Sequence, residues 1–320
     1  MVDLRAVYLA SIAVLLSSAG CGRVGFDPLQ EGLERGTDAG RDAPRLPMIV
    51  VPPDRGCDTR QPFSAPVLID SINSTVRDGD PSISGDELEM YFSSQRSGSF
   101  GNRDIWRSTR ASIADPWGPP VIDETLSTSS DERAPHLGSD ALRMYFSSDR
   151  PGGLGAADIW LVTREHRDAP WGDPIHVPEL NSAAADESPS LSEDERIVVF
   201  HSRRGPSIPD LYIATRPDGD AVWSTPQPIT ELNGSDTDSE PYLSADGLTI
   251  LFKTIRLTTA SGDLFIATRA SVADGFSAPV ALAGVNSVGD DGDPVLSRDG
   301  CALTFTSTIS GDWEIYQATR

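Results

Sequence analysis

The chain has 320 residues and a formal net charge of −22, and it contains 28 glycines and 25 prolines. This acidity argues against nucleic-acid binding, because neutralising phosphate groups requires clustered Lys and Arg. It also argues against adsorption of the folded surface to anionic lipid. Abundant Gly and Pro indicate many short strands joined by turns.

Residues 1–20 have the pattern of a lipoprotein signal peptide. The apolar run at residues 6–16 is too short to span a bilayer, follows Arg5 and precedes small residues. The segment Leu16-Ser-Ser-Ala-Gly-Cys21 resembles a bacterial lipobox, which implies that Cys21 carries a lipid. Gly22 after the cysteine implies an anchor in the outer membrane, facing the periplasm. The alternative is an ordinary signal peptide with an incidental Cys21.

Residues 21–57 predict a flexible linker from this anchor to a folded domain. The stretch is rich in Gly, Asp, Arg and Pro and lacks periodic apolar residues, so it cannot bury enough surface to fold. We therefore expect contact with the membrane through the lipid alone.

Residues 58–320 contain one unit five times. Each unit has a proline with an acidic residue three positions before it, and successive prolines are 54, 54, 52 and 53 residues apart. These anchor pairs are Asp78 and Pro81, Glu132 and Pro135, Asp186 and Pro189, Asp238 and Pro241, and Asp291 and Pro294. After the proline, each unit predicts a strand, a tight turn and a second strand that contains Phe. A third strand ends in Thr-Arg, and a proline-containing segment such as 117–121 suits an outer edge strand.

Four strands in each period predict an all-β fold, a five-bladed propeller of four-stranded antiparallel blades. The fifth unit ends at Arg320 without its outer strand, and the missing piece stands upstream at residues 63–69. We expect this N-terminal strand to join the last blade, closing the ring and removing an open sheet edge.

The two remaining cysteines lie near this closure. Cys57 comes six residues before the closing strand, and Cys301 begins the second strand of the same blade. An exported protein can form disulfides. We predict a disulfide between Cys57 and Cys301, and the alternative is two isolated thiols.

The unit resembles the TolB type of WD40-like propeller repeat. The matching words are Pro241-Tyr-Leu-Ser-Ala-Asp-Gly247 with Ile250-Leu-Phe252, and Pro81-Ser-Ile-Ser84 with Tyr91-Phe-Ser-Ser-Gln-Arg96. The resemblance covers residues 63–320 and implies a periplasmic scaffold that binds partner proteins. TolB itself has six blades and an extra N-terminal domain, whereas this chain has five units.

The acidic anchors are the first candidate site. Because they lead into the innermost strands, Asp78, Glu132, Asp186, Asp238 and Asp291 could ring one mouth of the channel and attract a cation such as Ca²⁺. Further acids would deepen the negative field there: Asp80, Asp131, Glu187, Glu240, Asp290 and Asp293. The alternative is that each anchor accepts backbone N–H groups in its connecting loop.

The regularity of the repeat favours a non-enzymatic envelope lipoprotein. We expect a monomeric scaffold that binds an envelope protein or peptide, or a glycan, with no resident cofactor. Five-bladed propellers also include glycoside hydrolases that take carboxylates from different blades. The alternative is therefore a glycoside hydrolase or sugar-binding protein, and it predicts two or three carboxylates at the channel mouth without repeat equivalents.

Overall fold

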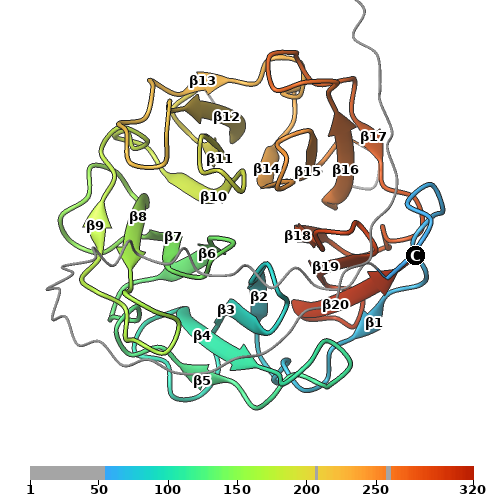
Figure 1. Cartoon of the computed structure of the whole chain (residues 1–320), viewed down its shortest axis with the longest axis horizontal. Helices are drawn as coiled ribbons and strands as arrows, with labels where there is room; N and C mark the ends of the chain where they lie inside the picture. Colours follow the sequence, from blue (N-terminus) through green and yellow to red (C-terminus); the bar gives the residue numbers. More distant parts are fainter. Residues whose placement is uncertain (1–54, 206–207, 257–260) are drawn as a thin grey trace, which may run out of the picture. The chain divides into compact units, whose positions relative to one another are not determined.

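The computed structural model describes residues 55–205, 208–256 and 261–320. They form a ring of five blades around a channel, and each blade is one four-stranded antiparallel sheet (Figure 1). The predicted fold class is thereby confirmed. None of the described residues belongs to a helix able to cross a membrane. The predicted signal peptide, Cys21 and most of the linker lie outside the described residues, so they stay predictions.

The inner two strands of each blade follow the anchor proline and its turn. The innermost strands, which surround the channel, are β2 (Asp78–Ile83), β6 (Glu132–Leu137), β10 (Asp186–Leu191), β14 (Asp238–Leu243) and β18 (Asp291–Leu296). The second strands are β3 (Glu89–Ser94), β7 (Arg143–Ser148), β11 (Ile197–Ser202), β15 (Thr249–Thr254) and β19 (Ala302–Ser307).

The outer two strands differ greatly in length. The third strands are β4 (Asp104–Thr109), β8 (Asp158–Thr163), β12 (Asp210–Thr215), β16 (Asp263–Thr268) and β20 (Glu314–Thr319). The fourth strands have only two residues each: β5 (Val121–Ile122), β9 (Ile175–His176), β13 (Gln227–Pro228), β17 (Val280–Ala281) and, in the last blade, β1 (Val67–Leu68).

The core lies between neighbouring blades. Every residue of the second strand β3 is buried, including Glu89, Ser93 and Ser94, because neighbouring blades cover the strand on both faces. A fully buried phenylalanine occupies the same place in each second strand: Phe92, Phe146, Phe200, Phe252 and Phe305.

The Thr-Arg ending of each unit has a packing role. Its guanidinium group lies 4.0 to 4.5 Å from the centroid of an aromatic ring that precedes the fourth strand, a cation–π contact. The pairs are Arg110 on Trp117, Arg164 on Trp171, Arg216 on Trp223, Arg269 on Phe276 and Arg320 on Phe63. Phe63 therefore has in the last blade the place that Trp117 has in the first.

The ring closes through the N-terminal strand, as predicted. β1 pairs antiparallel with β20, with Val67 opposite Gln317, and the N–H of Ser64 donates to the carbonyl of Thr319 at 2.7 Å. Only two of the seven residues expected in this strand have strand geometry.

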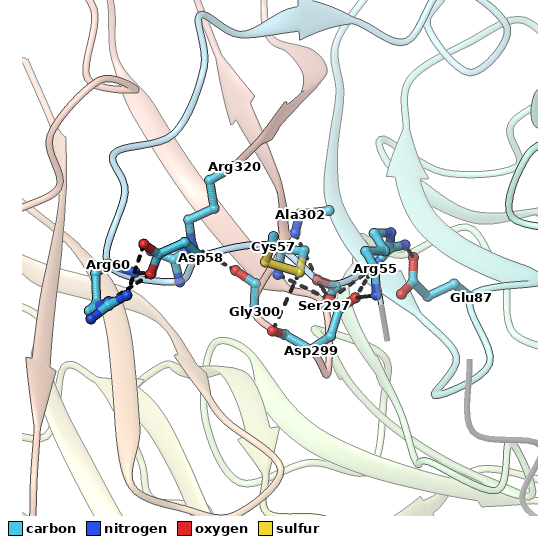
Figure 2. The surroundings of a disulfide bond; sticks show 11 residues. Arg55, Cys57, Asp58, Arg60, Glu87, Ser297, Asp299, Gly300, Ala302 and Arg320 are labelled. Carbon is cyan, nitrogen blue, oxygen red and sulfur yellow. Dashed lines mark hydrogen bonds and ion pairs between the residues drawn. A yellow bond between two sulfur atoms is a disulfide. The ribbon is translucent and has the colours of Figure 1, made fainter. Parts of the chain in front are cut away.

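The start of the described chain ties the last blade to the first. A disulfide joins Cys57 to Cys301, with their Cα atoms 5.7 Å apart (Figure 2). Arg55 pairs with Asp299 of the last blade at 2.8 Å and reaches Glu87 of the first blade. The covalent and ionic contacts together cover the seam where the ring closes.

Candidate active site

The five anchor acids are internal parts of their own blades. None has any exposed surface. Asp78 shows the arrangement: it accepts hydrogen bonds from the N–H and hydroxyl of Ser74, at 2.5 and 2.7 Å, and pairs with Arg96 at 2.5 Å. Glu132, Asp186 and Asp238 have the same type of arginine partner, and in the fifth blade Ile309 stands in its place. The structure thus places these carboxylates within the blade connections and not at the channel mouth.

Each innermost strand has a β-bulge two residues after the anchor acid. In the first blade, the pairing with the second strand shifts between Gly79 and Ser82, and Asp80 has φ of 52°. Non-glycine residues rarely adopt this left-handed conformation, and the proline that follows disfavours it further. The same conformation recurs in every blade, at φ values of 47 to 55°, and the bulge residues line the channel: Asp80, Ala134, Ser188, Glu240 and Asp293.

The bulge position is where the repeat loses its regularity. Three consecutive blades, the fourth, fifth and first, supply carboxyl groups, and the other two supply small side chains. We call Asp80, Glu240 and Asp293 the acidic mouth. Together with the anchor prolines they surround a cavity of about 70 Å³ in the channel, which has room for several water molecules.

Two of these carboxylates bridge blades. The N–H of Asp293 donates to Oε2 of Glu240 at 3.2 Å, and the N–H of Asp80 donates to Oδ2 of Asp293 at 3.3 Å. Where the second blade meets the third, and the third meets the fourth, the bulge N–H donates instead to a second-strand side chain. The acceptors are Oγ of Ser147 and Nδ1 of His201. The acidic mouth is therefore a continuous chain of three carboxyl groups across two blade junctions.

The pKa values of two of these carboxyl groups, Asp80 and Asp293, are displaced from their usual range. Burial and the neighbouring charges of Asp80 and Glu240 raise the pKa of Asp293 well above its usual range. Burial acts on Asp80 too, but Arg103, Arg77 and a hydrogen bond from Ser93 outweigh it and lower the pKa of Asp80. The pKa values of Asp293 and Asp80 are thus displaced in opposite directions, a separation that often marks acid and base roles.

Cations surround the acidic mouth, and most have carboxylate partners. Arg103 pairs with Asp131 at 2.7 Å, and Arg133 pairs with Glu187 at 2.9 Å. Lys253 lies 3.0 Å from Asp290 and 3.6 Å from Glu240. His201 and Arg133 outweigh the effect of burial and lower the pKa of Glu187 to about 2. These side chains occupy positions that differ from blade to blade.

The next layer of the channel, beyond the prolines, is structural. Ser82 accepts a hydrogen bond from the N–H of Leu137 at 2.8 Å, and Ser190 accepts one from Leu243 at 2.9 Å. Nε2 of His136 accepts from the N–H of Leu191 at 3.1 Å, so this imidazole is neutral. Burial lowers its pKa to about 4, which agrees with that role.

Within the three described ranges, no group of three or more His, Cys, Asp or Glu side chains is placed to hold a metal ion. The cation expected at the anchor acids therefore has no supporting geometry in this part of the chain. Of the other histidines, His176 contacts Asn181 at 3.0 Å and His166 is exposed.

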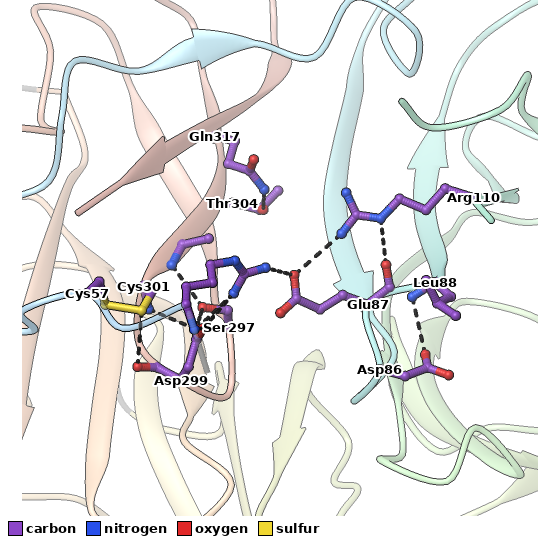
Figure 3. A network of polar contacts seen from close by, with 12 residues as sticks. Cys57, Asp86, Glu87, Leu88, Arg110, Ser297, Asp299, Cys301, Thr304 and Gln317 are labelled. Carbon is purple, nitrogen blue, oxygen red and sulfur yellow. Dashed lines mark hydrogen bonds and ion pairs between the residues drawn. A yellow bond between two sulfur atoms is a disulfide. The ribbon is translucent and has the colours of Figure 1, made fainter. Parts of the chain in front are cut away.

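The opposite end of the channel, where the hairpin turns gather, is mainly apolar. A cavity of about 100 Å³ is lined there by side chains such as Ile83, Leu137, Leu191 and Leu243. Glu87 stands at its edge and accepts hydrogen bonds from Arg110 and from Arg55, which lies next to the disulfide (Figure 3). The two ends of the channel thus differ in chemistry, acidic at one and apolar at the other.

Sequence comparisons assign no family, because neither family models nor curated protein sequences match the chain. Among solved structures, it is similar to an endo-arabinase from Bacteroides thetaiotaomicron, with a TM-score of 0.57, 16% identity, and coverage of 81% of this chain and 98% of that chain. An α-L-arabinofuranosidase from Podospora anserina gives a TM-score of 0.52, 14% identity and coverage of 80% and 95%. TolB from Acinetobacter baumannii gives 0.49, 16%, and 78% and 56%. At these identities the likenesses show the propeller fold alone.

The expectation that this chain is not an enzyme needs correction. Enzymes with TM-scores above 0.5 share the fold over about four-fifths of the chain. The expectation relied on the regularity of the repeat, and that regularity ends at the acidic mouth, where only three of the five blades supply a carboxyl group. The five-unit pattern therefore does not separate this chain from propeller enzymes.

Proposed function

We propose that the chain is a glycoside hydrolase whose active site is the acidic mouth. The observation that supports this most is the set of three carboxyl groups from consecutive blades, without equivalents in the other two blades. The pKa values of two of them, Asp80 and Asp293, are displaced in opposite directions. Hydrolysis of a glycosidic bond needs one carboxyl group that stays ionised and another that donates a proton. Arabinose-containing glycans are the first substrates to test, given the names of the structural neighbours.

The geometry favours particular roles for the three groups. Asp293 accepts the backbone N–H of Asp80, and its side chain is hydrogen-bonded to that of Asp80. These two carboxyl groups therefore lie closer together than the carboxyl pair of a glycosidase, which stands about 5 to 9.5 Å apart. Asp80 and Glu240, on either side of it, are the pair that can flank the bond. Asp293, whose pKa is raised, stands between them.

Asp80 is suited to activate water or attack the anomeric carbon. Arg103 and Arg77 stabilise its ionised form, and the cavity below it has room for water. We assign the role of proton donor to Glu240, because 21% of its side chain is exposed and it can reach a leaving group outside the channel. Donation of a proton by a positioned carboxyl group contributes about 10²- to 10⁴-fold to the rate.

A second candidate function concerns the apolar end of the channel. The cavity there has apolar walls and a polar edge, which suits a hydrophobic side chain of a partner protein or peptide. This supports a binding role on the face opposite the acidic mouth, and it is compatible with hydrolysis at the mouth. Crosslinking from this face in the native envelope would identify such a partner, and its absence with wild-type levels of protein would count against the role.

The test of the hydrolase proposal is a panel of 4-nitrophenyl glycosides and arabinan incubated with the purified chain. We expect release of nitrophenol or sugar from at least one substrate, and loss of at least 100-fold in Asp80→Asn. Glu193→Gln is the control, because Glu193 pairs with Arg298 at the apolar end. Hydrolysis of no substrate, or full activity in Asp80→Asn, would overturn the proposal.

A further inference from the structure

Arg77 stands at the acidic mouth in a position that no other blade fills with a cation. It comes directly before the first anchor acid. The corresponding residues of the other blades are Asp131, Ala185, Thr237 and Asp290. Its guanidinium group lies on the ring of Trp313, which also contacts Lys253, and Lys253 is 3.6 Å from Glu240 of the mouth. The charge of Arg77 also acts on Asp80 and Asp293. Because the other four blades fold without a cation at this position, we infer that Arg77 has a role at the mouth and not in the packing of its blade.

The guanidinium group of Arg77 lies on an aromatic ring and not on a carboxylate. Its central carbon is 4.7 Å from the ring centroid of Trp313. Its Nε is buried, and no described residue accepts a hydrogen bond from it. The other cations around the mouth, Arg103, Arg133 and Lys253, all pair with carboxylates. Among the cations of the described mouth, Arg77 is thus the one without a carboxylate partner, and it keeps donors that a ligand can use.

Trp313 also breaks the repeat. The other blades have Arg103, Ala157, Pro209 and Gly262 at its position. Nζ of Lys253 lies 4.7 Å from the same ring centroid, so one indole attracts two cations that would otherwise repel each other. This contact holds Arg77 beside the mouth without neutralising it.

We propose that Arg77, seated on Trp313, is a substrate-binding residue of the acidic mouth and donates hydrogen bonds to hydroxyl groups of a neutral sugar. The inference rests on the proposed function, since it concerns the same mouth. A planar guanidinium with free N–H groups can bind two neighbouring oxygens at once, as adjacent sugar hydroxyls present them.

The charge of the mouth favours a neutral sugar over an acidic one. Carboxyl groups outnumber cations there: Asp80, Glu240, Asp293, Asp131, Glu187 and Asp290 against Arg77, Arg103, Arg133 and Lys253. A uronic acid would bring a further negative charge next to ionised carboxylates. An acidic sugar that binds more tightly than its neutral counterpart would contradict this part of the inference.

The test compares Arg77→Met and Arg77→Lys on the best 4-nitrophenyl substrate of the panel. We expect KM to rise about tenfold or more in both, because Lys keeps the charge but not the planar fork. Arg77→Met should also move the acidic limb of the pH–rate profile upwards, since the charge of Arg77 favours ionised Asp80, and Arg77→Lys should restore that limb. Arg298→Met at the apolar end is the control.

Direct binding separates this inference from the proposed function. Isothermal titration of the Asp80→Asn variant with the free sugar released in the assay, or with L-arabinose if nothing is hydrolysed, measures binding without turnover. Binding that Arg77→Met weakens tenfold supports the inference even when no hydrolysis occurs. Hydrolysis with unchanged KM and unchanged binding in folded Arg77→Met would overturn the inference and leave the hydrolase proposal standing.

Discussion

The backbone N–H of Asp80 donates a hydrogen bond to Oδ2 of Asp293 at 3.3 Å, across the seam where the first and last blades meet. The hydroxyl of Thr306 donates to the same oxygen at 2.9 Å. The contact that closes the ring on the channel side therefore joins the two residues whose carboxyl pKa values are displaced in opposite directions. The stability of this seam therefore depends on the ionisation of Asp80 and Asp293, and mutations of either residue test both.

Asp293→Asn should stabilise the protein at high pH and not at low pH. The folded-state pKa of Asp293 is raised, so the folded protein holds a proton that the unfolded chain loses, and stability falls as pH rises through this interval. Asn cannot ionise and keeps an acceptor oxygen for the Asp80 N–H. We expect Tm to rise by about 2–4 °C at pH 8, which corresponds to roughly 1 kcal/mol, with no gain at pH 4.

Asp80→Asn is the control of opposite sign. The pKa of Asp80 is lowered in the folded state, so its carboxylate stabilises the protein at neutral pH, and that contribution is lost as pH falls. We expect a lower Tm at pH 8 in this variant. Equal shifts of Tm in both variants at pH 8 would contradict the opposite displacement of the pKa values of Asp293 and Asp80.

Ile309→Arg should supply the arginine that the fifth blade lacks. In the other four blades this arginine lies 2.5 to 3.2 Å from the anchor acid. Without it, burial raises the pKa of Asp291. We expect a gain of about 1–2 kcal/mol in the free energy of unfolding at pH 7, typical of a hydrogen bond to a charged group.

The pH dependence separates this effect from general packing. Once Asp291 is protonated, at about pH 3, the new arginine has no carboxylate to pair with, and the gain should vanish. Ile309→Gln, which adds a polar side chain without charge, is the matched control. Urea unfolding at both pH values measures the difference, and an equal gain at pH 3 and pH 7 would show that the new arginine had not paired with Asp291.

Loss of the disulfide should destabilise the ring. Cys57 and Cys301 are 244 residues apart in sequence, so their bond restricts nearly the whole unfolded propeller. We expect Cys57→Ser with Cys301→Ser to lower the free energy of unfolding by about 2–5 kcal/mol. Thiol titration checks that the disulfide forms. In a Cys21→Ser variant that keeps Cys57 and Cys301, the denatured chain should show no free thiol before reduction and two after it.

The architecture could be predicted because the same pattern of strands and turns occurs in every unit. The anchor prolines give the period, and the aromatic–proline segment at residues 63–69, which belongs to no complete unit, indicates how the ring closes. The structure puts Phe63 under Arg320, in the same way that Trp117 lies under Arg110. Five copies of one pattern therefore predict the strand order and the ring closure, which a single copy would not.

The site was harder to predict, because its position depends on the bulge. Regular strand alternation would put Asp78 and Asp80 on the same face. The positive φ of Asp80 breaks that alternation, so Asp78 turns into the blade connection and Asp80 lines the channel. A non-glycine residue in this conformation before proline has no clear sequence signal. The usable signal is variation: position 80 and its equivalents change in chemical type between blades, whereas the anchors are acidic in every blade.

The measurement that tests the central claim most directly is kcat/KM for the best glycoside in a set of variants from one channel layer. Asp80→Asn and Glu240→Gln alter the proposed catalytic pair, and Ser188→Ala alters a bulge residue of the third blade that lies outside it. We predict losses of at least 100-fold in the first two and a change of less than twofold in Ser188→Ala. Equal activity in all three folded variants would contradict an active site at the acidic mouth.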